Sequence, residues 1–383
     1  MNGQKITPLA LDEFESFYLA LYGKTPFDWQ KRLAKQVCLG GWPSYIKLPT
    51  ASGKTAAIDI AIFSLAYQAA ESNRSVGRMT TPRRIFFVVD RRIIVNEAYR
   101  RANAAANILR DVLDPKSETK VSKENRQILN RVARWLKTLT SDIAAPPLDC
   151  FELRGGIYRN DAWVRSLLQP TVLTSTVDQV GSRLLFRGYG VSDRNLSIHA
   201  ALTANDSLIV LDEAHCSKPF SQTLASIQRY RSERWAQESV ETPFQFVQMT
   251  ATPPADLDST SVLQLTDLDY TTDPLLEKRH GCSKPVQLVL AANAKGAKLN
   301  SLLAKRLAAE AVNLMKNKGR KKIAIVVNRV AIAREAYKEL AQKYPGRVHL
   351  MIGRMRPWDR DQLTTKLQDE FGSNTNKDSK HRH

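Results

Sequence analysis

Short apolar runs alternate with helix-like segments along most of this chain, and this alternation restricts the fold more than any other feature. The runs are rich in β-branched and aromatic residues, and segments such as 55–70 and 93–109 between them have helical character. This pattern predicts an α/β fold, with parallel sheets covered by helices on both faces. Buried strands are expected at 44–48, 84–89, 171–176, 207–213, 244–249 and 321–327.

The charge balance points to a polyanionic partner. The chain has 383 residues, which favours two or three domains, and 57 Lys and Arg stand against 38 Asp and Glu, a net charge of +19. A surplus of this size favours binding to a nucleic acid, because each neutralised phosphate releases counterions. The alternative is a generally basic surface without a dedicated ligand.

The cysteines and the hydropathy indicate a reduced, cytoplasmic protein. Four cysteines lie far apart, without a C-x-x-C pair, so neither a zinc knuckle nor a disulfide framework is expected. The N-terminus lacks the basic-then-apolar pattern of a signal peptide. No run approaches the ~18 apolar residues of a transmembrane helix, so no membrane partner is expected.

Three stretches interrupt the alternation. Residues 110–147 are polar and basic, and we interpret them as an insertion whose second half forms an amphipathic helix. Its inward residues would be Ile128, Val132, Trp135 and Leu136. The proline-containing stretch 253–285 is interpreted as a connector to a second α/β unit, and the polar C-terminus as a disordered tail.

The strand expected at 44–48 leads directly into PTASGKT at 49–55. A triphosphate needs backbone N–H groups at a helix N-terminus, a lysine that reaches its β and γ oxygens, and a hydroxyl for Mg²⁺. Lys54 and Thr55 would supply the last two. A strict loop has glycine where this chain has Leu48, and Ala51 adds a Cβ where the backbone curls around phosphate. The expected phosphate loop comprises Pro49, Thr50, Ala51, Ser52, Gly53, Lys54 and Thr55.

A pair of carboxylates ends the apolar strand at 207–213. Asp212 and Glu213 stand at its carboxyl end, where ligands collect in open α/β sheets. One carboxylate can hold Mg²⁺ through water, and the other can polarise an attacking water. A strand that merely ends in an acidic turn is the alternative, but it does not explain the following Ala214 and His215.

Together these strings resemble the motifs of a superfamily 2 helicase of the DEAH type. The phosphate loop, DEAH at 212–215 and MTATPP at 249–254 come in that family's order, each after an expected strand. FDWQ at 27–30 is similar to the glutamine motif that reads the adenine edge. The resemblance implies a RecA-like P-loop NTPase domain that uses ATP and Mg²⁺, followed by an incomplete second RecA-like domain.

Further strings resemble the loops with which this family grips a nucleic-acid backbone. They are VVDRRIIVNEAYRRA at 88–102, LRGG at 153–156 and TSTVDQVGSRLL at 174–185. With LDEAH, they are most similar to the CRISPR-associated helicase–nuclease of type I systems, in the variant whose helicase motifs begin near the N-terminus. This likeness implies single-stranded DNA and a Cascade-type surveillance complex as partners.

The resemblance assigns roles to matching positions. Gln30 would read adenine, Glu213 would act as the base for water attack, and Asp212 and Thr55 would hold Mg²⁺. His215, Thr250 and Thr252 would couple the nucleotide state to the strand-binding face. Expected strand-binding residues are Arg91, Arg92, Arg154, Gly155, Thr174, Thr176 and Gln179, with Asn328 and Arg354 in the second unit.

The resemblance also gives the domain plan. We expect an N-terminal extension at 1–25, a first RecA-like domain at 26–275, the start of a second at 276–372, and a tail at 373–383. No string after Leu363 resembles the Q-R-x-G-R-x-x-R motif that supplies arginine fingers, which are worth roughly 10³–10⁵ in rate. We therefore expect ATP binding with little turnover by this chain alone, and a separate or missing C-terminal half.

Nuclease activity is not expected of this chain, because none of its six histidines is followed by Asp. Two other interpretations remain. One is a DEAH helicase of another branch, acting on RNA or in DNA repair, since a preference for the 2′-OH is not readable from the sequence. The other is a non-catalytic, ATP-dependent strand-binding fragment.

Overall fold

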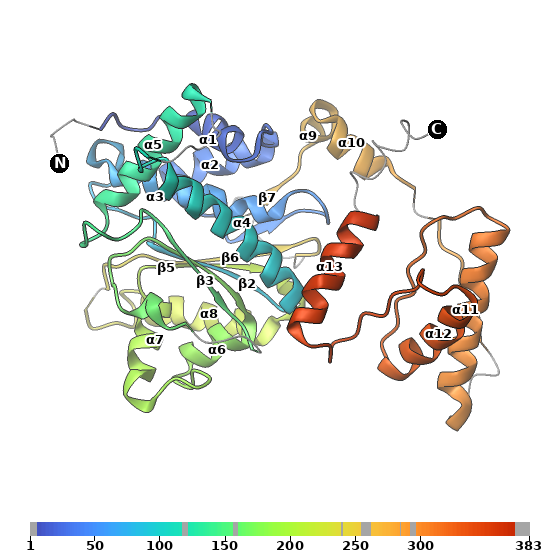
Figure 1. The fold of residues 1–383 in the computed structure, drawn as a ribbon. Helices are drawn as coiled ribbons and strands as arrows, with labels where there is room; N and C mark the ends of the chain where they lie inside the picture. Colours follow the sequence, from blue (N-terminus) through green and yellow to red (C-terminus); the bar gives the residue numbers. More distant parts are fainter. Residues whose placement is uncertain are drawn as a thin grey trace. The chain divides into compact units, whose positions relative to one another are not determined.

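Seven parallel strands form one sheet in the order β3-β4-β2-β5-β6-β1-β7 (Figure 1). The structure is a computed structural model that describes residues 6–116, 122–155, 160–238, 240–253, 262–283, 285–291 and 296–371. The chain divides into two compact units, residues 1–282 and 283–383, and the sheet belongs to the first. The strands are β1 (Tyr45–Lys47), β2 (Arg84–Val89), β3 (Asp149–Leu153), β4 (Thr171–Thr176), β5 (Ser207–Asp212), β6 (Phe244–Thr250) and β7 (Val262–Gln264).

Helices cover both faces of this sheet, as the continuous apolar strands predict. Along β2, Phe87 packs into one core and Phe86 into the other, because successive side chains point to opposite faces. Figure 1 shows α1 to α5 on one side of the sheet and α6 to α8 on the other. These helices are α1 (Glu13–Tyr22), α2 (Asp28–Gly40), α3 (Ala57–Ala69), α4 (Arg92–Asp111), α5 (Lys123–Thr138), α6 (Val177–Leu184), α7 (Leu196–Ala204) and α8 (Lys218–Tyr230).

Helix α3, which follows the phosphate loop, lies at the centre of the larger core. All of its residues are buried, including the charged Asp59. The apolar sequence AIDIAIFSLAYQA explains this position, because a helix that is apolar on all sides is stable only when it is covered all round. Burial of each large apolar side chain contributes about 1.5–3 kcal/mol, so the start of α3 is rigidly placed.

The N-terminal residues and the insertion pack together as part of the first unit. Phe14 and Phe17 of α1 are buried in the same core as α3, so the extension expected at 1–25 is not separate from it. Helix α5 is amphipathic as predicted, with Ile128, Val132 and Leu136 buried. Trp135 is only partly buried, and its indole N–H donates to the Thr7 carbonyl at 3.0 Å.

The stretch expected to be a plain connector instead completes the first unit. Strand β7 pairs with β1 at the sheet edge, and two short helices follow, α9 (Asp267–Thr272) and α10 (Pro274–Gly281). Leu276 of α10 is buried in the main core of this unit. The boundary between the units therefore lies after Cys282, beyond the position expected at 275/276.

The second unit differs from the prediction in one respect. Its helices are α11 (Leu299–Lys316), α12 (Val330–Lys343) and α13 (Pro357–Phe371), and α11 packs against α12. The strand expected at 321–327 is not formed in the described residues. Ile323, Ile325 and Val327 contact the helical clusters, whereas Val326 is 90% exposed. The segment thus alternates like a strand, but a strand also needs a partner for its backbone groups.

Among the described residues, none of the helices has the length and apolarity required to cross a membrane. The predicted C-terminal tail at 373–383 lies outside the described part of the chain.

Candidate ATP and nucleic-acid site

The phosphate loop follows β1 and is held by side chains of α2. The Trp29 indole N–H donates to the Ser52 carbonyl at 3.1 Å, and the Ser52 hydroxyl donates to the Pro49 carbonyl at 2.7 Å. Ala51 adopts a left-handed conformation with φ 63°, which is uncommon for a residue with a Cβ. The sequence had marked Ala51 as the difficult position, and the loop accommodates it at the cost of about 1–2 kcal/mol.

Gly53 shows why glycine is required directly before the lysine. Its φ is 82°, and a Cβ at this position would lie 2.8 Å from the Gln30 amide nitrogen. Gln30 is buried, donates to the Gly53 carbonyl at 3.1 Å and accepts from the Phe27 N–H at 2.9 Å. The predicted adenine reader is therefore bonded to the phosphate loop in this conformation, where it fixes the position of that loop.

Lys54 lies between the two carboxylates that end β5. Its ammonium nitrogen is 2.8 Å from Glu213 Oε1 and 3.4 Å from Asp212 Oδ1. Lys54 and Asp212 are both less than 10% exposed. Lys54 and Glu213 are 159 residues apart in sequence, and they meet because β1 and β5 both lie beside β6 and end at the same edge of the sheet. The structure thus brings the predicted catalytic residues together.

The backbone of Glu213 also has a left-handed conformation, with φ 49° and ψ 46°. Its N–H donates to Asp212 Oδ1 at 2.9 Å, which fixes the two carboxylates relative to each other. Burial raises the pKa of Asp212 above its ordinary value, and the charge of Lys54 opposes that rise. Such perturbed carboxylates are typical of functional sites, and strained backbone also collects at them.

These groups fit a nucleotide with a divalent ion. Phosphate oxygens would replace the carboxylates as partners of Lys54, and Asp212 with the Thr55 hydroxyl would hold Mg²⁺. The described residues contain no cluster of three or more His, Cys, Asp or Glu that could hold a metal without help. Mg²⁺ is usually held by one or two carboxylates together with substrate phosphates.

A second set of contacts joins the DEAH string to the end of β6. His215 Nδ1 lies 3.2 Å from the Thr250 hydroxyl and 3.5 Å from Glu213 Oε2. The N–H of Thr252 donates to the same hydroxyl at 3.1 Å. Thr250 is buried beside Lys47 in the sheet, so the predicted coupling residues form a continuous chain from Glu213 to β6.

The strand-binding residues predicted in the first unit come from the carboxyl ends of β2, β3 and β4. Arg91 follows β2 and is exposed, Arg154 follows β3, and Thr176 ends β4. These three strands are neighbours in the sheet. The residues predicted to bind nucleotide follow the adjacent strands β5, β6 and β1. One edge of the sheet therefore carries the predicted strand-binding residues on the half formed by β3, β4 and β2. The predicted nucleotide-binding residues lie on the half formed by β5, β6 and β1.

Several of these side chains already have partners in the protein. Arg154 Nε donates to Glu152 Oε1 at 2.5 Å, and Gln179 Oε1 accepts from Arg183 at 2.8 Å. Thr174 is fully buried inside β4, so its side chain does not reach a bound strand in this conformation. Gly155 lies in the turn after β3, and the side chain of Arg92 is outside the described part. In the second unit, Asn328 and Arg354 are exposed.

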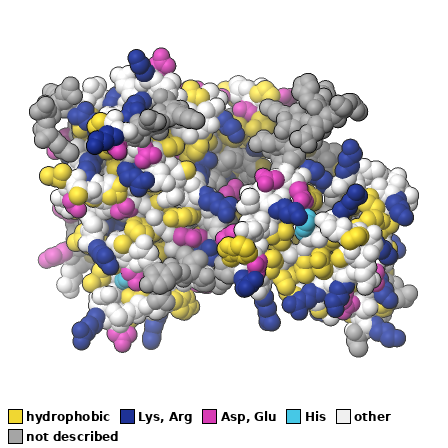
Figure 2. All heavy atoms as spheres, viewed as in Figure 1, with side chains coloured by type: hydrophobic (Ala, Val, Ile, Leu, Met, Phe, Trp, Pro, Cys, Tyr) yellow, Lys and Arg dark blue, Asp and Glu magenta, His cyan; other side chains and the backbone are white. Residues whose placement is uncertain are grey.

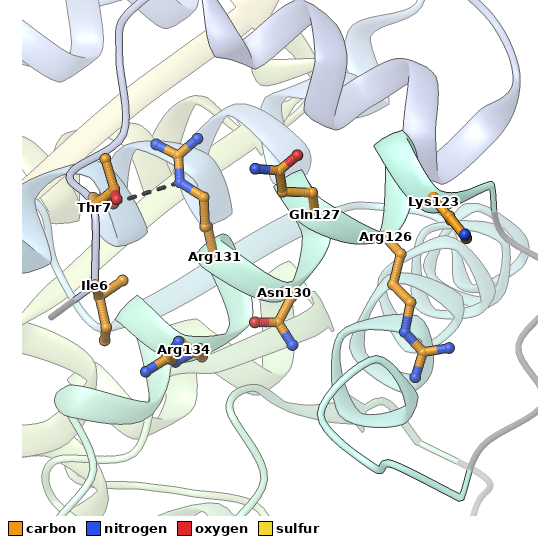
Figure 3. A pocket seen from close by; sticks show the side chains of 8 residues that line it. All are labelled: Ile6, Thr7, Lys123, Arg126, Gln127, Asn130, Arg131 and Arg134. Carbon is orange, nitrogen blue, oxygen red and sulfur yellow. Dashed lines mark hydrogen bonds between the residues drawn. The ribbon is translucent and has the colours of Figure 1, made fainter. Parts of the chain in front are cut away.

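A separate hollow of about 470 Å³ lies over α5 (Figure 3). It is lined by basic residues, among them Lys123, Arg126, Arg131 and Arg134. Arg131 binds Glu13 through both terminal nitrogens, at 2.5 and 2.9 Å, and also the Pro8 carbonyl at 2.6 Å. Its charge therefore fastens the N-terminal segment to α5, and the hollow contains none of the predicted site residues.

Comparison with known families agrees with this geometry. The family model described as the res subunit of type III restriction enzymes matches residues 24–255, more than half of the chain. The chain belongs to this helicase family. The match includes the phosphate-loop string, the DEAH string and the two threonines predicted to have a coupling role, so the superfamily 2 helicase assignment is confirmed. No curated protein gives a significant match.

Solved structures with a similar fold include a Cas3 and a DEAD-box splicing factor. T. fusca Cas3 shares 14% identity with a TM-score of 0.47, over 97% of this chain and 40% of that chain. The yeast DEAD-box splicing factor Prp28 shares 13% identity with a TM-score of 0.36, over 96% of this chain and 71% of that chain. The chain thus spans less than half the length of the Cas3 structure. Both likenesses concern the fold alone.

Proposed function

We propose that this chain is the ATP- and strand-binding part of a helicase that moves along single-stranded DNA in CRISPR antiviral defence. The main support for this proposal is that Lys54 contacts Asp212 and Glu213 at one edge of the sheet. The neighbouring strand ends at the same edge bear Arg91 and Thr176. Helicase-family membership supports ATP as the cofactor. The DNA substrate and the Cascade-type partner rest on the sequence strings that resemble the CRISPR-associated branch.

The lysine–carboxylate contact suggests how nucleotide binding prepares the site. In this conformation the ammonium of Lys54 contacts both carboxylates, and its single positive charge offsets one of their two negative charges. Triphosphate oxygens would attract Lys54 more strongly, because a triphosphate carries more negative charge than a single carboxylate. Glu213 would then be free to accept a proton from the attacking water. Mg²⁺, when bound by Asp212 and Thr55, would neutralise charge on the phosphates.

Loss of the lysine tests the nucleotide site. We expect Lys54→Ala to weaken ATP binding by about 10- to 100-fold, because a charged hydrogen bond contributes roughly 1.5–3 kcal/mol. Titration of a fluorescent ATP analogue would measure this. Lys47→Ala, on the exposed end of β1, is the matched control and should bind like the wild type. Equal affinity in Lys54→Ala and wild type would refute the site assignment.

Charge supports a nucleic acid as the second ligand. Residues 283–383 contain 22 Lys and Arg against 8 Asp and Glu, so +14 of the net +19 lies in this quarter of the chain. Figure 2 shows Lys and Arg spread over the visible face instead of gathered in one strip. Contacts of Lys and Arg with phosphates give affinity for a nucleic-acid backbone without sequence readout.

Binding to single-stranded DNA should depend on Arg91. We expect Arg91→Ala to weaken binding of labelled oligothymidylate about threefold to tenfold, and to reduce the slope of log affinity against log salt by about 0.7. Fluorescence anisotropy at several salt concentrations measures both. Arg110→Ala, at the exposed far end of α4, is the control. An unchanged slope in Arg91→Ala would remove this residue from the strand site.

The same assays separate the alternatives. Tighter binding of oligouridylate than of oligothymidylate would favour a helicase of another branch that acts on RNA. Binding of both ATP and DNA without hydrolysis would favour a non-catalytic strand-binding module. Hydrolysis by residues 1–383 at the rate of a complete helicase would contradict the expectation of slow turnover.

A further inference from the structure

The helix pair α9–α10, which the sequence did not predict, is fastened to the helix that carries the glutamine motif. Both terminal nitrogens of Arg32 in α2 donate to the Asp269 carboxylate, at 2.6 and 2.7 Å, and Asp269 is 1% exposed. The Thr272 hydroxyl also donates to Asp28 at 3.1 Å. These bonds hold the pair against α2, and α2 holds the phosphate loop through Trp29 and Gln30.

The last turn of α10 reaches the phosphate loop itself. Arg279 is exposed, and its Nη1 donates to the Ala51 carbonyl, although 228 residues separate the two in sequence. Ala51 has a left-handed conformation with φ 63°, so Arg279 binds the loop at a residue whose backbone conformation is uncommon for a residue with a Cβ. Leu276, three residues before Arg279, is anchored in the core.

The guanidinium of Arg279 binds a neutral carbonyl in the structure, and the phosphates of the proposed nucleotide would be a stronger partner. A neutral carbonyl accepts a single hydrogen bond from Arg279, whereas phosphate oxygens accept paired, charge-assisted bonds from an arginine. The loop that Arg279 contacts is the one that would surround those oxygens. No acidic side chain is found beside Arg279 among the described ion pairs, so formation of a phosphate contact need not break a salt bridge.

We propose that Arg279 is a further nucleotide-binding residue, which exchanges the Ala51 carbonyl for the phosphates of a bound nucleoside di- or triphosphate. This inference rests on the proposed ATP site. Arg279 lies three residues before the end of the first unit at Cys282. A change of partner by Arg279 would therefore alter the contacts of α10, the last helix of the first unit. A residue that binds phosphate would then lie just before the segment that connects the first unit to the second.

Nucleotide titrations of the full chain test the proposal. Arg279→Gln should weaken binding of ATP and ADP by about tenfold and leave adenosine binding unchanged, because adenosine has no phosphate. Arg279→Lys should restore part of the loss, since it keeps the charge without the paired donors. Lys278→Gln, the neighbouring basic residue on α10, is the matched control and should bind all three ligands like the wild type.

A purely structural role predicts a different result. If Arg279 only holds the loop in its present conformation, its replacement should change adenosine and ATP affinity by equal factors, and that outcome overturns the proposal. Unchanged ATP affinity in Arg279→Gln overturns it as well. If Lys54→Ala loses ATP binding while Arg279→Gln does not, the ATP site stands and only Arg279 is excluded. If the wild type binds no ATP, the proposed function fails together with this inference.

Discussion

Replacement of Glu213 by glutamine should lower the rate of ATP hydrolysis, which is expected to be slow already in the wild-type chain, by about 10²- to 10⁴-fold, the usual contribution of a general base. Binding of ATP should be retained or should become tighter. In the structure Glu213 holds Lys54 at 2.8 Å, so the carboxylate competes with the phosphates for the lysine. Glutamine keeps the shape of the side chain but removes that competing charge. Single-turnover hydrolysis and a parallel ATP titration measure the two effects.

Glu241→Gln is the control for this substitution. Glu241 is exposed in the loop before β6, and its replacement should change neither quantity. Unchanged hydrolysis in Glu213→Gln would assign the base to another residue. A large loss of ATP affinity in the same variant would mean that Glu213 positions the loop instead of activating water.

The sequence predicted the central strands and missed those at the edges. Five of its six expected strands form β1, β2, β4, β5 and β6, which lie next to one another in the sheet. The two that it missed, β3 and β7, are the two edge strands. Strand β3 has the sequence DCFEL, with two acidic residues, because an edge strand is only half covered and needs no continuous apolar run.

In the second unit the sequence predicted a strand that the structure does not contain in the described residues, and the cause is related. The run at 321–327 has the composition of a strand, yet it is not paired in the described residues. Composition reports what a segment can bury, whereas a strand also depends on a neighbour that supplies backbone hydrogen bonds. That neighbour is set by residues distant in sequence, which a local pattern does not contain.

In the candidate site, too, local motifs could be predicted from the sequence, whereas contacts between residues distant in sequence could not. The residues of the phosphate loop and the DEAH string were predicted, because each motif is a short local string whose chemistry is recognisable. Trp29 and Arg279, which hold the loop, were missed, since a single tryptophan or arginine carries no local signal of a contact far along the chain. The burial of Thr174 was also unforeseen, because position in the family motif says nothing about which face of a strand is covered.

The buried charge on α3 should have the largest effect on stability. Asp59 is 0% exposed and binds Arg101 of α4 at 2.6 and 2.9 Å and the Tyr22 hydroxyl of α1 at 2.6 Å. The guanidinium of Arg101 also lies 4.0 Å from the centroid of the Tyr22 ring. We expect Asp59→Ala to lower the free energy of unfolding by about 3–5 kcal/mol, because it leaves Arg101 largely buried without its counterion.

Urea unfolding followed by tryptophan fluorescence measures this loss, and five of the six tryptophans lie in the first unit. Asp111→Ala is the matched control. Asp111 forms an ion pair with Arg110 on α4, the helix that also contains Arg101, but this pair lies at an exposed site. It should cost less than about 0.5 kcal/mol. A cost below about 1 kcal/mol for Asp59→Ala would contradict the prediction.

The double variant Asp59→Leu with Arg101→Met separates the ion pair from the packing. It should be considerably more stable than the sum of the two single replacements predicts, because neither charge is then left buried alone. The pair joins α3, which begins after the phosphate loop, to α4, which begins after Arg91. One outcome is that the double variant folds well but its ATP affinity no longer changes when DNA binds. The pair would then also couple the DNA-binding half of the sheet edge to the nucleotide-binding half. If the response is retained, the pair serves stability alone.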